Sequence, residues 1–187
     1  MAALPIRISG DPVLHARAHD VTDFGPELNT LVNDMFETMD AAPGVGLAAP
    51  QVGVALRLFV YGWHDDEVEH RGVAINPVLW ITPPPPGEPD EETESEGCLS
   101  FPGERFPLRR SPSALLQAIG LDQKPFEVRA DGWLARIFQH EFDHLDGLLY
   151  VDRLTYPYDR AAAKATRKQS WGVPGKSWLP GVDHLED

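Results

Sequence analysis

Hydrophobic residues along the chain recur at spacings that predict both helices and strands. Six apolar residues within positions 26–40 are separated by alternate steps of three and one: Leu28, Leu31, Val32, Met35, Phe36 and Met39. That spacing predicts an amphipathic helix with one buried face, and Pro26 suits its first turn. Residues 56–61 and 73–80 are short runs rich in β-formers, so we expect two strands joined by the polar segment 62–72.

The second half of the chain adds a strand pair and two further helices. Residues 113–121 and 126–129 predict strands around a turn at 122–125. A helix is expected from Gly132 to about Leu145, with Asp131 as its N-cap, and another over residues 158–171. Residues 82–95 contain four consecutive prolines, which exclude a helix or a central strand, so this segment is predicted to be an exposed acidic loop.

Length and composition narrow the class of protein. At 187 residues the chain fits one domain, which we place at residues 1–171, followed by an irregular tail at 172–187. No apolar run is long enough to span a membrane, and no secretory signal is visible at the start. A single cysteine excludes an internal disulfide framework and fits the reducing cytoplasm. The net charge of −13 argues against a DNA-binding protein.

The helix at 132–145 carries ionisable residues where apolar ones are expected. Its polar strip holds Arg136, Gln139 and Asp143, and apolar residues occupy most of the remaining surface. His140, Glu141 and His144 project into that apolar sector, where charge is costly unless it is paired or bound to a metal. The i, i+4 histidines can grip one ion with the glutamate beside it. The alternative is a pair of core histidines that form hydrogen bonds to the backbone, with Glu141 at the surface.

A catalytic metal needs a third protein ligand. Asp152, Asp159 and His184 are downstream candidates, and Cys98 is the upstream one. A thiolate with two imidazoles suits zinc or ferrous iron and leaves one position for water. For Cys98 taken by itself, the alternative is the commoner role of a small buried hydrophobic residue.

Three segments then occur in a fixed order: 44–51 (GVGLAAPQ), 96–100 (EGCLS) and 139–147 (QHEFDHLDG). They closely resemble the signature motifs of peptide deformylases, and the resemblance extends from about Ile6 to Arg153. The acidic proline loop and the segment after Asp159 lie outside that signature and resemble actinobacterial-type members. The resemblance implies an α+β fold in which a central metal-bearing helix packs among small antiparallel β-sheets, with an N-terminal amphipathic helix and a C-terminal helix.

The resemblance also implies an activity, the removal of the formyl group from the N-terminal formylmethionine of nascent polypeptides with release of formate. It implies that Cys98, His140 and His144 hold the metal, with Glu141 as the proton acceptor. Ferrous iron is the expected ion, with Zn²⁺, Ni²⁺ or Co²⁺ as alternatives in the purified protein.

Further residues of the motifs receive roles from the same resemblance. The Gln51 amide and the Leu99 N–H are expected to point at the developing oxyanion, although Gln51 could instead brace the Cys98 strand. The substrate-binding set is Gly44, Val45, Gly46, Glu96, Gly97 and Ile137. The first three are expected to pair with the peptide as an added strand. We also expect Arg105, Arg109 or Arg110 to pair with Glu96.

Partners and rival functions follow from these assignments. The substrates are N-formylmethionyl nascent peptides, and the ribosome is an expected transient partner. Four basic residues share one face of the C-terminal helix and could contact it: Arg160, Lys164, Arg167 and Lys168. The rivals are a metallopeptidase of the His-Glu-x-x-His type and a non-catalytic metal-binding module.

Overall fold

The computed structural model describes residues 3–65, 68–183 and 185. Its helices are α1 (Pro26–Ala41), α2 (Gly132–Leu145) and α3 (Tyr158–Lys168), with short 3₁₀ helices η1 (Pro12–His15), η2 (Ala49–Val52) and η3 (Tyr150–Arg153). Its strands are β1 (Ile6–Arg7), β2 (Gly46–Ala48), β3 (Leu58–His64), β4 (Glu69–Ile81), β5 (Ser95–Cys98), β6 (Phe101–Pro107), β7 (Ser113–Ile119), β8 (Pro125–Asp131) and β9 (Ser177–Trp178).

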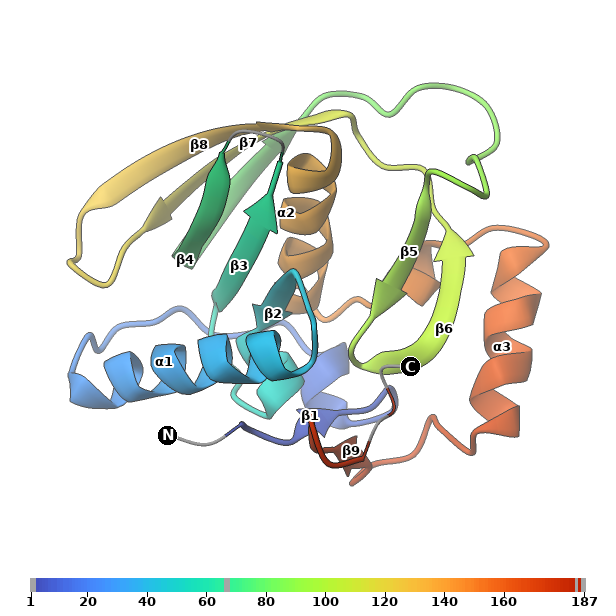
Figure 1. Cartoon of the computed structure of the whole chain (residues 1–187), viewed down its shortest axis with the longest axis horizontal. Coiled ribbons are helices and arrows are strands. Elements are labelled where there is room, and N and C mark those ends of the chain that lie inside the picture. Colours follow the sequence, from blue (N-terminus) through green and yellow to red (C-terminus); the bar gives the residue numbers. More distant parts are fainter. Residues whose placement is uncertain (1–2, 66–67, 184, 186–187) are drawn as a thin grey trace.

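In the described part of the chain, the strands form three antiparallel sheets, of which the largest packs against α2. The largest sheet has the order β2-β3-β4-β7-β8, and the two smaller ones are β5-β6 and β1-β9. Figure 1 shows α2 between the large sheet on one side and the β5-β6 pair on the other. The predicted α+β architecture, with a central helix among small antiparallel sheets, is therefore confirmed.

Packing explains why α2 is the centre of the fold. Its apolar residues Leu134, Ile137 and Phe138 are buried against the large sheet, where Phe138 meets the rings of Phe59 and Tyr61. The face of α2 that carries the two histidines is directed toward β5, as the 3.3 Å separation of the Cys98 and His144 donor atoms shows. Within the described residues, no helix has the length and apolar character that a membrane span requires.

Several element boundaries differ from those predicted. β3 and β4 continue through most of the segment 62–72 because their backbones pair up to His64 and Glu69; residues 66–67 lie outside the described part. α3 ends at Lys168, three residues early, and Trp171 leaves it to pack on Phe101 at 4.7 Å. Asp131 occupies the N-cap position of α2, but its side chain accepts a hydrogen bond from Ser113 instead of capping the helix.

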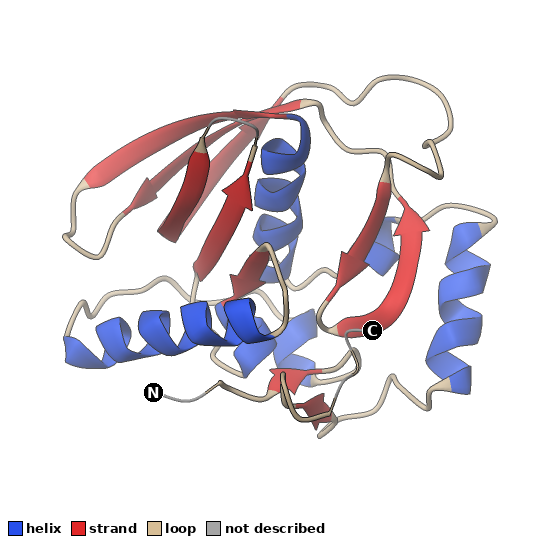
Figure 2. Cartoon of the chain, in the orientation of Figure 1, coloured by secondary structure: helices blue, strands red, loops and turns tan. Residues whose placement is uncertain are grey.

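The acidic proline segment is largely the loop that the sequence predicted. Residues 82–94 connect β4 to β5 without a helix or strand (Figure 2), although Ser95 already belongs to β5. Arg109 holds the loop: it bonds to the Glu94 carboxylate and to the carbonyls of Pro86 and Glu88. The loop is thus tied to the protein at several points.

Residues 172–187 were predicted to form an irregular tail, but part of this segment is a β-strand. Ser177 and Trp178 form β9, which pairs with Arg7 and Ile6 of β1. The Trp178 side chain is 1% exposed and lies in the core that also buries Ile6 and Met35. Burial of this large ring accounts for the ordered strand. Residues 184 and 186–187 of the predicted tail lie outside the described residues.

Candidate metal and catalytic site

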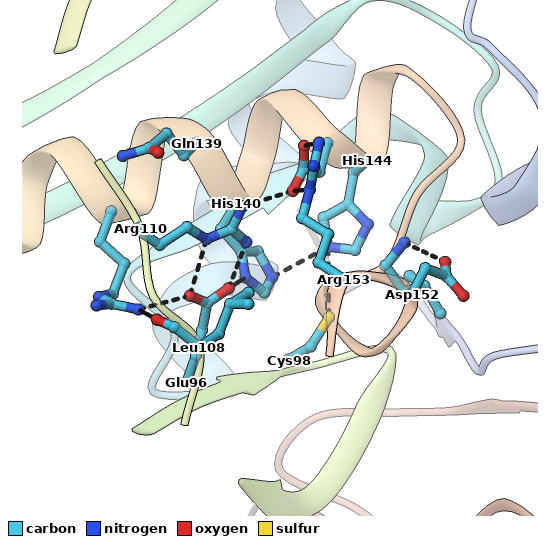
Figure 3. Close-up of polar contacts among 12 residues, drawn as sticks. Glu96, Cys98, Leu108, Arg110, Gln139, His140, His144, Asp152 and Arg153 are labelled. Atoms are coloured by element: carbon cyan, nitrogen blue, oxygen red, sulfur yellow. Dashed lines mark hydrogen bonds and ion pairs between the residues drawn. The ribbon is translucent and has the colours of Figure 1, made fainter. Parts of the chain in front are cut away.

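Three potential metal ligands from two distant segments converge at the centre of the molecule. Cys98 ends β5, and His140 and His144 lie one turn apart on α2. The Cys98 Sγ lies 3.3 Å from His144 Nε2, which in turn lies 3.2 Å from His140 Nε2 (Figure 3). All three residues are buried, and their donor atoms lie within 4.8 Å of one another.

The spacing of these donors fits a bound metal ion. Bond lengths of about 2.05 Å to nitrogen and about 2.3 Å to sulfur give tetrahedral edges of about 3.3 Å between two nitrogens and about 3.6 Å between nitrogen and sulfur. The two measured separations are close to these edges. Of the other ligand candidates, Asp152 instead accepts from the Leu149 N–H, Asp159 from the Arg160 N–H, and His184 lies outside the described residues.

Glu96 holds the outer ring nitrogen of His140. Its Oε1 lies 2.6 Å from His140 Nδ1, which directs Nε2 toward Cys98 and His144. The same carboxylate accepts from Arg110 at 2.6 Å (Figure 3). It also accepts from Arg136, at 3.0 Å. Arg110 is thus the expected arginine partner of Glu96, and Arg136 is a second one that the sequence did not predict.

The polar strip of α2 is buried and supports this arrangement. Arg110 bridges Glu96 to Asp143, whose carboxylate also binds Arg153. Gln139 accepts from the Ser111 N–H and donates to the Ser111 carbonyl. The periodicity of α2 placed these polar residues on one strip but did not reveal that β5 and the segment after β6 cover it.

Burial and charge set the protonation of the two histidines in the absence of a metal. Burial disfavours charge on His140, but the Cys98 and Glu96 side chains outweigh it and raise the pKa of His140 well above its usual value. Burial, followed by repulsion from His140, lowers the pKa of His144 well below its usual value. A metal ion would have to displace the proton from His140 in order to bind.

Glu141 lies between the two histidines in the sequence and forms no ion pair with another described residue. Its Oε2 is buried and has no hydrogen-bond partner among the described residues. Its Oε1 packs against the backbone of Gly46, where a Cβ atom would lie only 2.3 Å away. Burial raises the pKa of Glu141 to about 7, so this carboxyl can accept or release a proton near neutrality.

The Gln51 side chain has a defined orientation. Its Oε1 accepts from the Ala48 N–H at 2.8 Å, which leaves the NH₂ group directed toward Ser100 Oγ, at 3.3 Å, and Cys98 Sγ, at 3.7 Å. The Ser100 N–H also approaches Cys98 Sγ, at 3.4 Å. Hydrogen-bond donors therefore surround the sulfur.

A cavity of about 500 Å³ opens beside these groups. Its wall includes the following predicted site residues: Gly44, Val45, Gly46, Gln51, Glu96, Gly97, Cys98, Leu99, Ile137, His140 and Glu141. The cavity also reaches Trp63 and Trp133, whose rings stack with their centroids 6.1 Å apart. Their aromatic character was visible in the sequence, but nothing local linked these two tryptophans.

This fold and donor set define an α+β enzyme with a potential metal site and an adjacent buried glutamate. The polypeptide deformylase family model matches residues 3–159. The chain is 52% identical to a peptide deformylase of Tropheryma whipplei, over 95% of this chain and 93% of that protein, and 50% identical to one of Mycolicibacterium smegmatis, over 97% and 96%.

A solved structure shows the same similarity in three dimensions. The peptide deformylase of Synechococcus elongatus, in complex with actinonin, superposes with a TM-score of 0.78 at 34% identity and covers 94% of both chains. The chain belongs to the peptide deformylase family, a family of enzymes that act on nascent peptides.

Proposed function

We propose that this protein is a metal-dependent hydrolase that removes the formyl group from N-terminal formylmethionine and releases formate. The observation that carries the proposal is the convergence of Cys98, His140 and His144 next to a buried glutamate. Of this group, Cys98, His140 and Glu141 line the cavity. Family membership and the actinonin complex of a related deformylase support the same reaction.

We propose Cys98, His140 and His144 as the metal ligands and Fe²⁺ as the native ion. One thiolate and two imidazoles also suit Zn²⁺, Ni²⁺ and Co²⁺. When bound, such an ion polarises a carbonyl and lowers the pKa of water toward neutrality. Glu96 acts through His140 by fixing its ring, so its role is to position a ligand, with Arg110 and Arg136 holding its carboxylate.

Glu141 is the proposed proton acceptor and donor. Its raised pKa allows it to take a proton from the attacking water and to return that proton to the departing amine. Such positioned proton transfer is typically worth about 10²–10⁴ in rate. The close packing of Gly46 under Oε1 fixes the position of the carboxylate.

Gln51 and Leu99 are the proposed donors to the negative oxygen of the tetrahedral intermediate. The Gln51 carbonyl is occupied by Ala48, so its NH₂ end faces Cys98 and is available on the cavity wall. The Leu99 N–H follows the Cys98 ligand directly, and Leu99 also lines the cavity. Loss of one such donor typically reduces turnover by about 10²–10³.

The free edge of β2 is the proposed binding site for the substrate backbone. β2 is the outermost strand of its sheet. The Gly62 N–H of β3 donates to the Val45 carbonyl, and the next residue, Gly46, lies opposite Tyr61. Because bonding residues alternate in an antiparallel pair, Gly46 directs its N–H and C=O away from β3. A peptide can therefore add as a strand there, bound through main-chain groups common to all sequences.

The methionine side chain is proposed to enter the apolar part of the cavity. Ile137 lies there, one turn before Glu141 on α2, with the stacked Trp63 and Trp133 at the wall. Gly97 and Gly44 line the same cavity, where the absence of a side chain leaves room for the peptide. This lining suits an unbranched apolar side chain.

The ribosome is a proposed transient partner. The exposed face of α3 carries four basic residues, Arg160, Lys164, Arg167 and Lys168. Ala162 and Ala165 are buried on the opposite face of the helix. This basic face suits RNA phosphates. Reversal of charge at Lys164 and Arg167 should weaken co-sedimentation with ribosomes at low salt, and unaltered co-sedimentation would rule the contact out.

We further propose that residues 1–171 form the catalytic domain and that Trp178, which lies beyond this range, completes its core. The ring of Trp178 in that core supports this extension.

The proposed reaction is tested by formate release under anaerobic conditions, with the metal content measured in the same samples. Formyl-Met peptides should release formate, and unformylated peptides of the same sequence should remain intact. Cleavage of internal peptide bonds would instead favour the metallopeptidase. Equal activity of Glu141→Gln and the native chain would exclude the proposed role of the glutamate.

A further inference from the structure

Trp178, in the segment that was predicted to be irregular, contacts residues 98–100, which contain the proposed ligand Cys98 and the proposed oxyanion donor Leu99. Its indole Nε1–H donates a 2.8 Å hydrogen bond to the carbonyl oxygen of Leu99. The ring is 1% exposed, and buried indoles usually need a partner for this N–H. Trp178 reaches the loop because β9 pairs with β1 and directs the ring into the core beside Leu99.

The peptide unit between Leu99 and Ser100 is held at both ends. Its carbonyl accepts from Trp178, and its N–H, which belongs to Ser100, points at Cys98 Sγ at 3.4 Å. The next carbonyl, that of Ser100, accepts from the Ser9 N–H at 2.9 Å. Ser9 in turn accepts from Gly172, so both terminal segments of the chain brace this loop.

The Leu99 side chain is restrained as well. A Cβ atom on Gly44 would lie 3.0 Å from Leu99 Cδ1, so the side chain packs tightly on the segment before β2. Trp178 fixes the Leu99–Ser100 peptide plane, and Cys98, the residue before Leu99, is fixed as a proposed metal ligand. The Leu99 N–H therefore has little freedom to rotate. Its direction is then set by the fold before substrate binds.

We propose that Trp178 is a positioning residue, which fixes the Leu99–Ser100 peptide so that the Leu99 N–H faces the cavity and the Ser100 N–H faces the Cys98 sulfur. The inference rests on the proposed function, since it assigns the Leu99 N–H to the oxyanion. Donation to the Leu99 carbonyl also polarises the Ser100 N–H, because hydrogen bonds in a chain strengthen one another. Trp178 thereby acts on both the oxyanion donor and the thiolate.

The first experiment removes the indole donor from the metal-loaded full chain. Trp178→Phe should lower kcat at least about tenfold per metal-loaded site and leave KM nearly unchanged, because the affected donor acts on the transition state. Trp171→Phe is the matched control: its ring packs on Phe101 in the same region, and kcat should stay near the native value. A native kcat in Trp178→Phe would overturn the proposal.

Two further measurements separate positioning from a general loss of packing. In the cobalt-substituted protein, Trp178→Phe should shift the thiolate-to-metal charge-transfer band to longer wavelength, whereas Trp171→Phe should not. In the native chain, the Trp178 indole N–H should exchange slowly with solvent. An unchanged charge-transfer band in Trp178→Phe, together with rapid exchange of the Trp178 indole N–H in the native chain, would overturn the positioning role. Neither measurement depends on formate release.

A second variant avoids the change in ring size if Trp178→Phe does not fold. Replacement of Trp178 by β-(3-benzothienyl)alanine keeps the shape of the ring and removes only the N–H donor. It should reproduce both the lower kcat and the cobalt shift. Absence of formate release by the native metal-loaded chain would refute the proposed function, whereas an active native chain with an equally active benzothienyl variant would refute the role of Trp178 alone.

Discussion

Gly46 lies directly against the Glu141 carboxylate, so Gly46→Ala is a steric perturbation of the proposed proton acceptor. The new Cβ atom would lie 2.3 Å from Glu141 Oε1 and 2.7 Å from its Cδ. The backbone at Gly46 is not in the left-handed region, so alanine itself is compatible with the strand. The steric overlap is therefore with the Glu141 side chain, which has to move.

The size of the effect follows from that overlap. Cβ contacts below 3.0 Å are essentially never observed, so the carboxylate must move by about 1 Å. A misplacement of about 1 Å in a catalytic arrangement can cost about 10² in rate, which equals about 2.7 kcal/mol in the activation barrier. We therefore expect Gly46→Ala to lower kcat about 10²-fold.

The assay is formate release from a formyl-Met peptide, with kcat expressed per bound metal. Gly62→Ala is the control, because it changes the neighbouring strand β3 and its Cβ would meet only the flexible ends of two side chains, Met39 at 3.1 Å and Arg71 at 3.2 Å. Glu141→Gln completes a double-mutant cycle. Since both substitutions act on one carboxylate, Gly46→Ala should have little further effect in the Glu141→Gln background.

Two results would refute this reasoning. A native kcat in Gly46→Ala would mean that the position of Glu141 does not limit the reaction. Fully additive losses in the double variant would mean that alanine acts elsewhere, for example on the peptide bound at the edge of β2.

Three further predictions concern stability and metal binding. Glu96→Gln leaves the buried Arg110 and Arg136 without their shared anion, so the free energy of unfolding should fall by about 3–5 kcal/mol and metal affinity by about 10–100-fold; unchanged thermal unfolding and activity would contradict the bracing role. Chelation of the metal should lower Tm, because the ion binds the folded chain; equal Tm values for the loaded and stripped protein would argue against the site. In the stripped protein, the folded-state pKa of Glu141, about 7, exceeds the value of 4.5 expected when unfolded, so the stability contributed by the neutral carboxyl is complete below 4.5 and is lost as pH rises through 7. The stability advantage of Glu141→Gln over the native chain should therefore grow by about 2 kcal/mol between pH 5 and pH 8 in urea titrations, and a constant difference would be inconsistent with the raised pKa.

Much of the local structure was predictable, because it depends on short-range geometry. Helical periodicity identified α1 and α2 to within about one residue. The same periodicity placed His140 and His144 on one face of α2, one turn apart. The prediction of strand ends from polarity was less accurate. β3 and β4 extend into the polar segment 62–72 because backbone pairing does not require apolar side chains.

The partners of the site residues were harder to predict from the sequence. Three arginines were candidates for Glu96, and the choice of Arg110, together with Arg136, depends on how β5 and the segment after β6 cover α2. The same covering buries Asp143, although it belongs to the polar strip of α2. Trp63 and Trp133 meet only because β3 lies beside the start of α2.

The sequence by itself determined which residue types stand at helical and motif spacings, because those spacings are properties of one continuous stretch of backbone. Tertiary structure decided which distant segments touch: Cys98 with the two histidines, Gly46 with Glu141, and Trp178 with Leu99. These contacts arise from burial of whole faces and from the pairing of strands far apart in the chain. The resemblance to a known family implied the first of these contacts, but no local pattern encodes any of them, since the same side chains at the same spacing could face solvent in another fold.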